Sequence, residues 1–191
     1  MVEIEGERVL AASCKRKVSE GMVVKTDTER ADKSRRMVFE LLLADMPEQP
    51  IDAQSSFHEW LAECSIEGGR LPSKRADTDA VLASPLHDVS NPAIAVNMDA
   101  CIACNLCVRA CREVQVNDVL GMADRGHHAV PVFDIHDPMG ISTCVTCGEC
   151  VQACPTGALF EKTLMDGDNR TRVIEDFDAK TDSVCQFCGV G

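Results

Sequence analysis

Hydrophobic and polar residues alternate along the first 25 positions of the chain. Val2 and Ile4 flank a glutamate, a turn is possible around Gly6, and apolar positions return in segments 8–10 and 21–25. An alternation with period two is typical of half-buried strands. The pattern predicts a small β-rich unit here.

From about Asp32 the apolar positions take the spacing of a helix. They lie at i, i+1, i+4 and i+5, which places them on one helical face. These positions are Met37, Val38, Leu41 and Leu42. Asp32 or Ser34 could cap the start of this helix and Pro47 would end it, and we expect the apolar face to pack in a core.

Residues 47–92 carry weaker signals. The segment holds five of the eight prolines of the chain, and a short helix is possible around residues 57–61. Because proline interrupts regular elements, we interpret this segment as a linker that packs in part.

The next part of the chain contains an internal repeat of cysteines. Residues 101–111 read CIACNLCVRAC and residues 144–154 read CVTCGECVQAC, so both follow the spacing C-x2-C-x2-C-x3-C. Apolar segments at 128–133 and 158–161 predict short strands beside the repeat. A motif that occurs twice indicates two equivalent sites in one domain.

This cysteine spacing is typical of [4Fe–4S] clusters. Such a cluster has four iron corners that each take one thiolate, and one C-x2-C-x2-C loop can wrap three of them. In two-cluster ferredoxins the cysteine that follows each triplet ligates the other cluster. We therefore expect crossed ligation. One cluster is predicted on Cys101, Cys104, Cys107 and Cys154, and the other on Cys144, Cys147, Cys150 and Cys111.

Zinc is the alternative metal for these cysteines. Structural zinc sites normally use cysteine pairs with a longer spacer between them, and two triplets plus two single cysteines do not satisfy that pattern. Pro155 follows Cys154 as in the bacterial motif, whereas Arg112 follows Cys111. We expect this departure to change the local bend and not the ligation. The repeat offers no base, nucleophile or substrate pocket, so it predicts single-electron transfer.

Composition limits the partners and the compartment. The formal net charge of −12 argues against a nucleic-acid partner, because binding would release few phosphate counterions. The first residues do not resemble a signal peptide, and no apolar run approaches the roughly 20 residues of a membrane span. Twelve cysteines, eight of them in metal motifs, indicate a reducing compartment. We predict a cytoplasmic location and no membrane span.

Four cysteines lie outside the repeat. Cys185 and Cys188 form a C-x2-C pair that could be half of a zinc site, a redox pair or half of another cluster. Cys14 stands alone and could be an ordinary strand cysteine. Cys64 is predicted to be a small buried apolar residue.

Several stretches resemble the alpha subunit of cytoplasmic NAD-dependent formate dehydrogenase, of the molybdenum or tungsten bis-pterin type. They are AASC at 11–14 with EGMVV at 20–24, ELLL at 40–43, CVRACREVQVND at 107–118 and VCQFCGVG at 184–191. The resemblance covers nearly the whole chain. Large subunits of NADH-quinone oxidoreductase and of NAD-reducing hydrogenase are similar through the first domain. They usually add a cluster held by one histidine and three cysteines where residues 43–47 continue here, and this difference favours formate dehydrogenase.

The resemblance implies an α+β chain that is truncated at both ends. We expect a partial β-grasp [2Fe–2S]-ferredoxin-like domain at 1–46 and a linker at 47–92. A two-cluster bacterial-type ferredoxin domain would follow at 93–165. A connector with the first part of a molybdopterin-oxidoreductase [4Fe–4S] motif would occupy 166–191. Cys14 would then be the fourth ligand of a [2Fe–2S] cluster, and Cys185 with Cys188 half of a third [4Fe–4S] site, the missing ligands coming from other chains.

The function implied is the relay of single electrons between a formate-oxidising metal–pterin site and a flavin/NAD partner. This chain would lack the catalytic domain, so its partners would be a molybdenum or tungsten pterin polypeptide and a flavin- and NAD-binding subunit. The alternatives are a free-standing two-cluster ferredoxin-like carrier, the equivalent segment of an NADH-quinone oxidoreductase or NAD-reducing hydrogenase subunit, and a fragment that does not fold. A relay segment should expose apolar side chains where its neighbours dock, and a free carrier should not.

Overall fold

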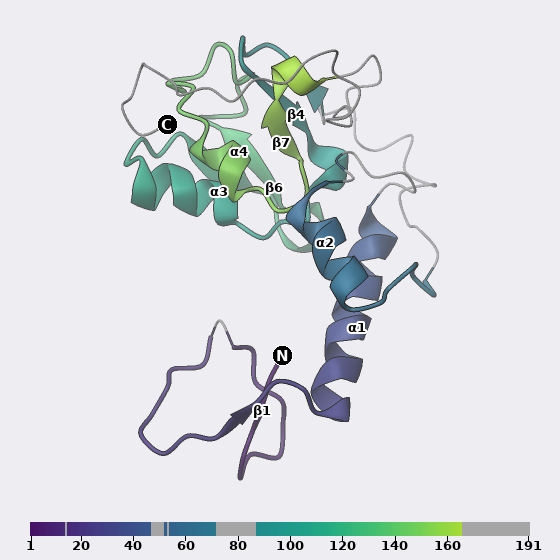
Figure 1. Ribbon diagram of the computed structural model, residues 1–191. Helices are drawn as coiled ribbons and strands as arrows, with labels where there is room; N and C mark the ends of the chain where they lie inside the picture. Colours follow the sequence, from purple (N-terminus) through teal and green to yellow (C-terminus); the bar gives the residue numbers. More distant parts are fainter. Residues whose placement is uncertain (14, 47–51, 53, 72–86, 166–191) are drawn as a thin grey trace, which may run out of the picture.

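The computed structural model describes residues 1–13, 15–46, 52, 54–71 and 87–165. Figure 1 shows two groups of elements joined by the long helix α1 (Glu29–Asp45). A small β unit lies at the start of this helix, and a mixed α/β unit lies beyond its end. The cysteine repeat belongs to the mixed unit.

The N-terminal unit is built on two very short strands. β1 (Glu3–Ile4) pairs antiparallel with β2 (Val24–Lys25), and Val2 forms a bridge with Ala11. The turn predicted around Gly6 is confirmed, with Gly6 at φ +84°. The strand expected at 8–10 does not form, and the Arg8 carbonyl accepts a hydrogen bond from the Arg30 guanidinium (2.8 Å).

Helix α1 starts before the predicted caps. Thr28 is its N-cap, and the Thr28 hydroxyl accepts a hydrogen bond from the Ala31 backbone N–H (3.2 Å). Asp32 lies inside the helix, where it pairs with Arg36 four residues later (2.9 Å). The helix ends at Asp45, as the proline at 47 predicts.

The buried face of α1 differs from the expected one. Met37, Val38 and Leu41 are 40–50% exposed, so the prediction that this stripe is core is wrong for three of its four members. The helix packs instead through a face at i, i+3, i+4 and i+7. This face consists of Phe39, Leu42, Leu43 and Met46.

Part of the predicted linker belongs to the mixed unit. Helix α2 (Ser56–Glu63) confirms the expected short helix, and its Phe57 side chain is completely buried. The Phe57 ring lies 5.7 Å from the Phe39 ring, and its backbone N–H donates to the Pro155 carbonyl (2.8 Å). Helix α2 therefore connects α1 to the cysteine repeat.

The mixed unit combines two small antiparallel sheets with short helices. Strand β4 (Ile94–Asn97) lies between β3 (His87–Asp88) and β7 (Leu159–Glu161). Strands β5 (Leu120–Ala123) and β6 (Val130–Phe133) form a separate hairpin. The predicted strands near 128–133 and 158–161 are confirmed, whereas β3, β4 and β5 were not expected. The remaining elements are η2 (Met98–Ala100), α3 (Leu106–Arg109), the π-helix η3 (Ala110–Val114), η4 (Gly126–His128), α4 (Glu149–Ala153) and η5 (Lys162–Leu164).

The sheet of β4 and β7 separates two hydrophobic cores. Ile94, Val96 and Leu159 face a core that contains buried cysteines, and Ala95 and Phe160 face a core shared with α1 and α2. This division follows from the alternation of side chains along a strand. Among the described residues, no helix combines the length and the apolar character needed to cross a bilayer.

We predict that Phe57→Ala lowers the free energy of unfolding by about 3–4 kcal/mol, because it leaves a cavity between α1 and the mixed unit. Trp60→Ala is the control, since Trp60 is 41% exposed on the same helix. Denaturant titration of the iron-loaded chain would measure both. Equal midpoints for the two variants would contradict the packing role of α2.

Candidate iron–sulfur centres

The two cysteine loops have the same local structure. The Ala103 N–H donates to the Cys101 sulfur, and the Thr146 N–H donates to the Cys144 sulfur, both at 3.4 Å. Ala103 and Thr146 also share a left-handed backbone, with φ of +52° and +57°. The sequence repeat is therefore a structural repeat.

Each loop leads into a helix that carries the third cysteine of its motif, Cys107 in α3 and Cys150 in α4. Asn105 at φ +66° precedes α3, and Gly148 at φ +84° precedes α4 at the matching position. The fourth cysteine follows four residues later, in the π-helix η3 for Cys111 and at the C-cap of α4 for Cys154. The third and fourth cysteines of each motif thus line different cavities.

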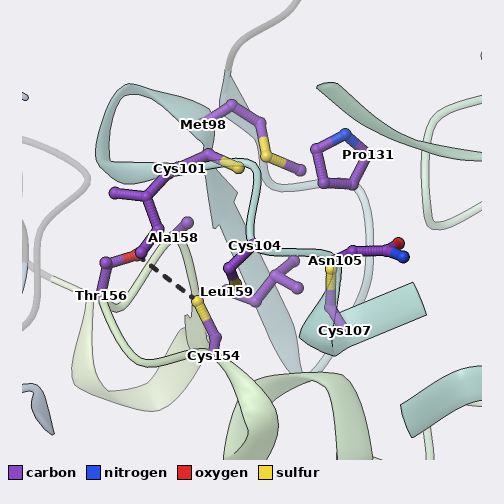
Figure 2. Close-up of a pocket in the computed structure, with 11 residues that line it drawn as sticks. Met98, Cys101, Cys104, Asn105, Cys107, Pro131, Cys154, Thr156, Ala158 and Leu159 are labelled. Atoms are coloured by element: carbon purple, nitrogen blue, oxygen red, sulfur yellow. Dashed lines mark hydrogen bonds between the residues drawn. The ribbon is translucent and has the colours of Figure 1, made fainter. Parts of the chain in front are cut away.

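The structure brings the eight cysteines together in the two crossed sets that the spacing predicts. Two cavities of about 330 and 320 Å³, measured with their openings, are each lined by four cysteines. The first set is Cys101, Cys104, Cys107 and Cys154, and the second is Cys111, Cys144, Cys147 and Cys150. Figure 2 shows the first set around its cavity. Ligation of iron by these sulfurs remains a prediction.

The two halves differ after the fourth cysteine. Helix α4 ends at Ala153, with Cys154 as its C-cap, and the following Pro155 cannot donate a helical hydrogen bond. In the first half, Cys111 lies in the π-helix η3, which continues to Val114. Widened helical turns of this kind are frequent at functional sites. The absence of proline changes the local bend, as the sequence predicts.

Burial makes several of the cysteine thiols weaker acids than a free cysteine. Burial first, and then the negative charge of neighbouring cysteine sulfurs, raises the pKa of Cys107 and of Cys150 to about 12. Burial also raises the pKa of Cys104 and Cys144. Without metal these thiols therefore hold their protons at neutral pH, and iron must displace the protons when it binds.

The donor set fits [4Fe–4S] clusters. Within the described ranges, no three His, Cys, Asp or Glu side chains form a group that could hold a single metal ion. The sulfurs surround a cavity instead, and a cluster needs one thiolate at each of four separate iron corners. The nine cysteines in the described part of the chain are not joined in disulfides, as this chemistry requires.

A buried hydroxyl lies beside the first set. The Thr156 side chain is 1% exposed, and its Oγ1 is 3.7 Å from Cys154 Sγ (dashed line in Figure 2). The matching position of the first half is Glu113, an exposed residue that pairs with Arg109 (2.9 Å). Thr156 was not among the residues predicted from the sequence. Its signal was a lone polar residue in the otherwise apolar stretch that follows Cys154.

The cysteines outside the repeat add little to these sites. Cys64 is only partly buried at the end of α2, so the prediction that it is a buried residue is wrong. Cys14, Cys185 and Cys188 lie outside the described residues.

Comparisons with known proteins agree with this geometry. Residues 100–158 match the family described as "4Fe-4S dicluster domain", and residues 139–190 match a second family with the same description. Two [4Fe–4S] clusters are therefore the cofactors of this part of the chain.

The similar proteins are redox enzymes or their subunits. The HndD subunit of the NADP-reducing hydrogenase of Solidesulfovibrio fructosivorans is 37% identical over 84% of this chain and 27% of its own length. A subunit of an NADH-quinone oxidoreductase of Rhizobium meliloti is 34% identical over the whole chain and 21% of its own length. A putative formate dehydrogenase of Staphylococcus haemolyticus is 24% identical over the whole chain and 22% of its own length. The chain thus spans about a fifth to a quarter of these relatives.

A solved structure shares the fold. A chain of an NAD+-reducing [NiFe]-hydrogenase, in the H2-reduced state, superposes with a TM-score of 0.70 at 21% identity. The match covers 84% of this chain and 67% of that chain.

We predict that Thr156→Val lowers the reduction potential of the cluster on the Cys101 set. Valine keeps the volume but removes a donor to a ligating sulfur, and such hydrogen bonds help set the potential. A loss of about 1 kcal/mol corresponds to about 40 mV for one electron. An EPR-monitored redox titration would measure the change, and Thr156→Ser is the control. An unchanged potential would show that the hydroxyl has only a packing role.

Proposed function

We propose that this chain, an iron–sulfur electron-transfer module with a 4Fe–4S dicluster domain, relays single electrons between a formate-oxidising metal–pterin site and a flavin/NAD partner. The pair of crossed four-cysteine cavities in one core carries the electron-transfer part of this proposal. A cytoplasmic location and partner subunits for both half-reactions belong to the same proposal.

The proposed ligands are the eight cysteines of the repeat. Four thiolates would hold each cluster, and a bound cluster supplies one-electron chemistry. The chain provides a core that limits the access of water to the sites. It also provides backbone N–H groups that donate to the sulfurs. Three of the proposed ligands belong to one continuous core, namely Cys107, Cys111 and Cys150. Because this core contacts both sites, it holds the two sites at a fixed separation.

Exposed apolar side chains within and before the second cysteine loop in sequence support a relay over a free carrier. Val145 lies between two cysteines of the loop and is 65% exposed, and Ile141 and Ile135 are 75% and 91% exposed. In a free carrier these apolar side chains would stay exposed to water. In a relay segment a neighbouring subunit that docks here would cover them.

The formate branch rests on the resemblance of residues 107–118 and 184–191. The comparisons do not single out this branch. The hydrogenase and NADH-quinone oxidoreductase relatives are 37% and 34% identical, against 24% for the formate dehydrogenase relative. These identities favour the second candidate, which is the equivalent relay segment in one of those subunits.

The proposed domains are a partial [2Fe–2S]-type unit at 1–46 and a two-cluster domain at 93–165. The packing of α2 against β4 and β7 adds residues 56–63 to the second of these. Cys14, Cys185 and Cys188 would complete further clusters only with ligands from other chains.

Crossed ligation can be tested with two matched pairs of substitutions. Cys104→Ala with Cys154→Ala removes two ligands from one proposed site, so we expect about half of the wild-type iron and one intact [4Fe–4S] centre. Cys147→Ala with Cys154→Ala removes one ligand from each site and should disturb both. Iron and sulfide counts with EPR after anaerobic reconstitution would measure this. The opposite ranking of the two variants would overturn crossed ligation.

The formate relay can be tested on the complex purified anaerobically from the native host through a tag on this chain. We expect formate to produce reduced-cluster EPR signals before NAD+ is added, and NAD+ to reoxidise them. Molybdenum or tungsten should co-purify. Reduction by hydrogen or NADH but not by formate would favour the second candidate, and purification of the chain alone would favour a free carrier.

A further inference from the structure

The rest of the chain covers the two cysteine loops differently. The second residue of the first loop, Ile102, packs against the core that α1 and α2 share with the sheet. The matching residue of the second loop is Val145, which is 65% exposed and belongs to neither core of the described residues. Because the two loops have the same local structure, the second loop presents the face that this chain's own helices cover on the first.

Two hydrogen bonds gather further exposed apolar side chains beside Val145. Asp134 Oδ2 accepts from the Thr143 N–H (2.7 Å), and Asp134 Oδ1 accepts from the Thr143 hydroxyl (2.8 Å). Ile135 follows Asp134, and Ile141 and Val145 lie two residues before and after Thr143. Each of the three is thus within about 8 Å, measured between Cα atoms, of one member of the bonded pair. We call Ile135, Ile141 and Val145 the apolar patch.

The surroundings of the apolar patch are acidic. Residues 126–161 contain four carboxylates and no lysine or arginine. Asp134 and Asp137 lie on either side of Ile135, and Glu149 is the first residue of α4. Within the described part of the chain, none of these three carboxylates forms an ion pair. Their negative charge can therefore attract a basic partner.

We propose that the apolar patch is the docking surface for a redox subunit that exchanges electrons with the second cluster, and that this subunit presents an apolar centre surrounded by basic side chains. The inference rests on the proposed relay function. An apolar centre excludes water from such a contact, and opposite charges around it orient the two proteins. Val145 lies between Cys144 and Cys147, so a partner that covers it lies beside two proposed cluster ligands. The path of the electron is then short.

The charges favour a different subunit over a second copy of this chain. A symmetric contact through the apolar patch would bring the carboxylates of both copies together, and like charges across an interface are unfavourable. The first loop offers no equivalent surface, because Ile102 already packs inside the chain. One cluster of the two therefore faces the partner.

The first test compares Ile141→Asp with Val116→Asp in the complex purified anaerobically from the native host. Both side chains are apolar and more than 70% exposed, but Val116 follows the first cysteine motif and lies outside the apolar patch. We expect Ile141→Asp to weaken retention of the partner about tenfold, because it places a charge in an apolar contact. Val116→Asp should retain the partner as the wild type does. Iron and sulfide counts should stay at the wild-type level in both variants.

Asp137→Lys tests the charge of the partner. If the partner is basic around its centre, this reversal should weaken retention about threefold at low salt, and the difference from wild type should vanish in about 0.5 M salt. Glu59→Lys is the matched control, since Glu59 is an exposed carboxylate on α2, which belongs to the side of the first loop. Unchanged or tighter retention of Asp137→Lys would show that the partner is not basic there and would overturn the inference.

The outcomes separate this inference from the proposed function. Reduction of the clusters in the wild-type complex by formate, hydrogen or NADH tests the relay itself. If the clusters are reduced in this way and Ile141→Asp retains the partner as well as Val116→Asp does, the docking surface is overturned and the relay stands. Release of a second copy of this chain, instead of a different subunit, would also overturn the inference. A wild-type chain that purifies without any partner would overturn both.

Discussion

The mixed unit must pack its core around two cavities lined by cysteine thiols, and the rest of its structure depends on this constraint. Cys107, Cys111 and Cys150 lie in the same core as Ile94 and Phe133. A core that surrounds two spaces loses dispersion contacts on their walls, and bound clusters would supply those contacts. This explains how a chain with 4% aromatic residues and no tyrosine can form a core. It also ties the stability of the unit to its iron content.

The sheet of β4 and β7 connects the cysteine core to the rest of the chain, because it packs on both of its faces. One face carries apolar residues toward the cysteines, and the other packs against α1 and α2. Phe57 lies completely buried on this second face. A segment that looks like a linker in composition is thus a structural layer, because the sheet needs cover on both faces.

The two cysteine motifs are alike in backbone and different in surroundings. The N–H donors to Cys101 and Cys144 match in position and distance. Beyond them, the Thr156 hydroxyl lies 3.7 Å from Cys154 Sγ in one site, and the Asn91 amide donates to Thr146 in the loop of the other. Equal ligands with unequal neighbours would give two clusters different potentials. Such a difference would set which cluster holds the electron.

The sequence by itself determined the features that depend on local spacing. The two cysteine motifs, the end of α1 before Pro47 and the short helix near Phe57 all follow from residues that are close in the chain. The crossed grouping joins distant cysteines, and its prediction came from the known pattern of two-cluster ferredoxins. Tertiary structure alone decided which face of α1 is buried, because Met37, Val38 and Leu41 have the right spacing but no partner surface among the described residues. It also decided that Asn91 reaches Thr146, 55 residues away. Periodicity reports that a side chain can be buried, and only the folded chain supplies the group that it contacts.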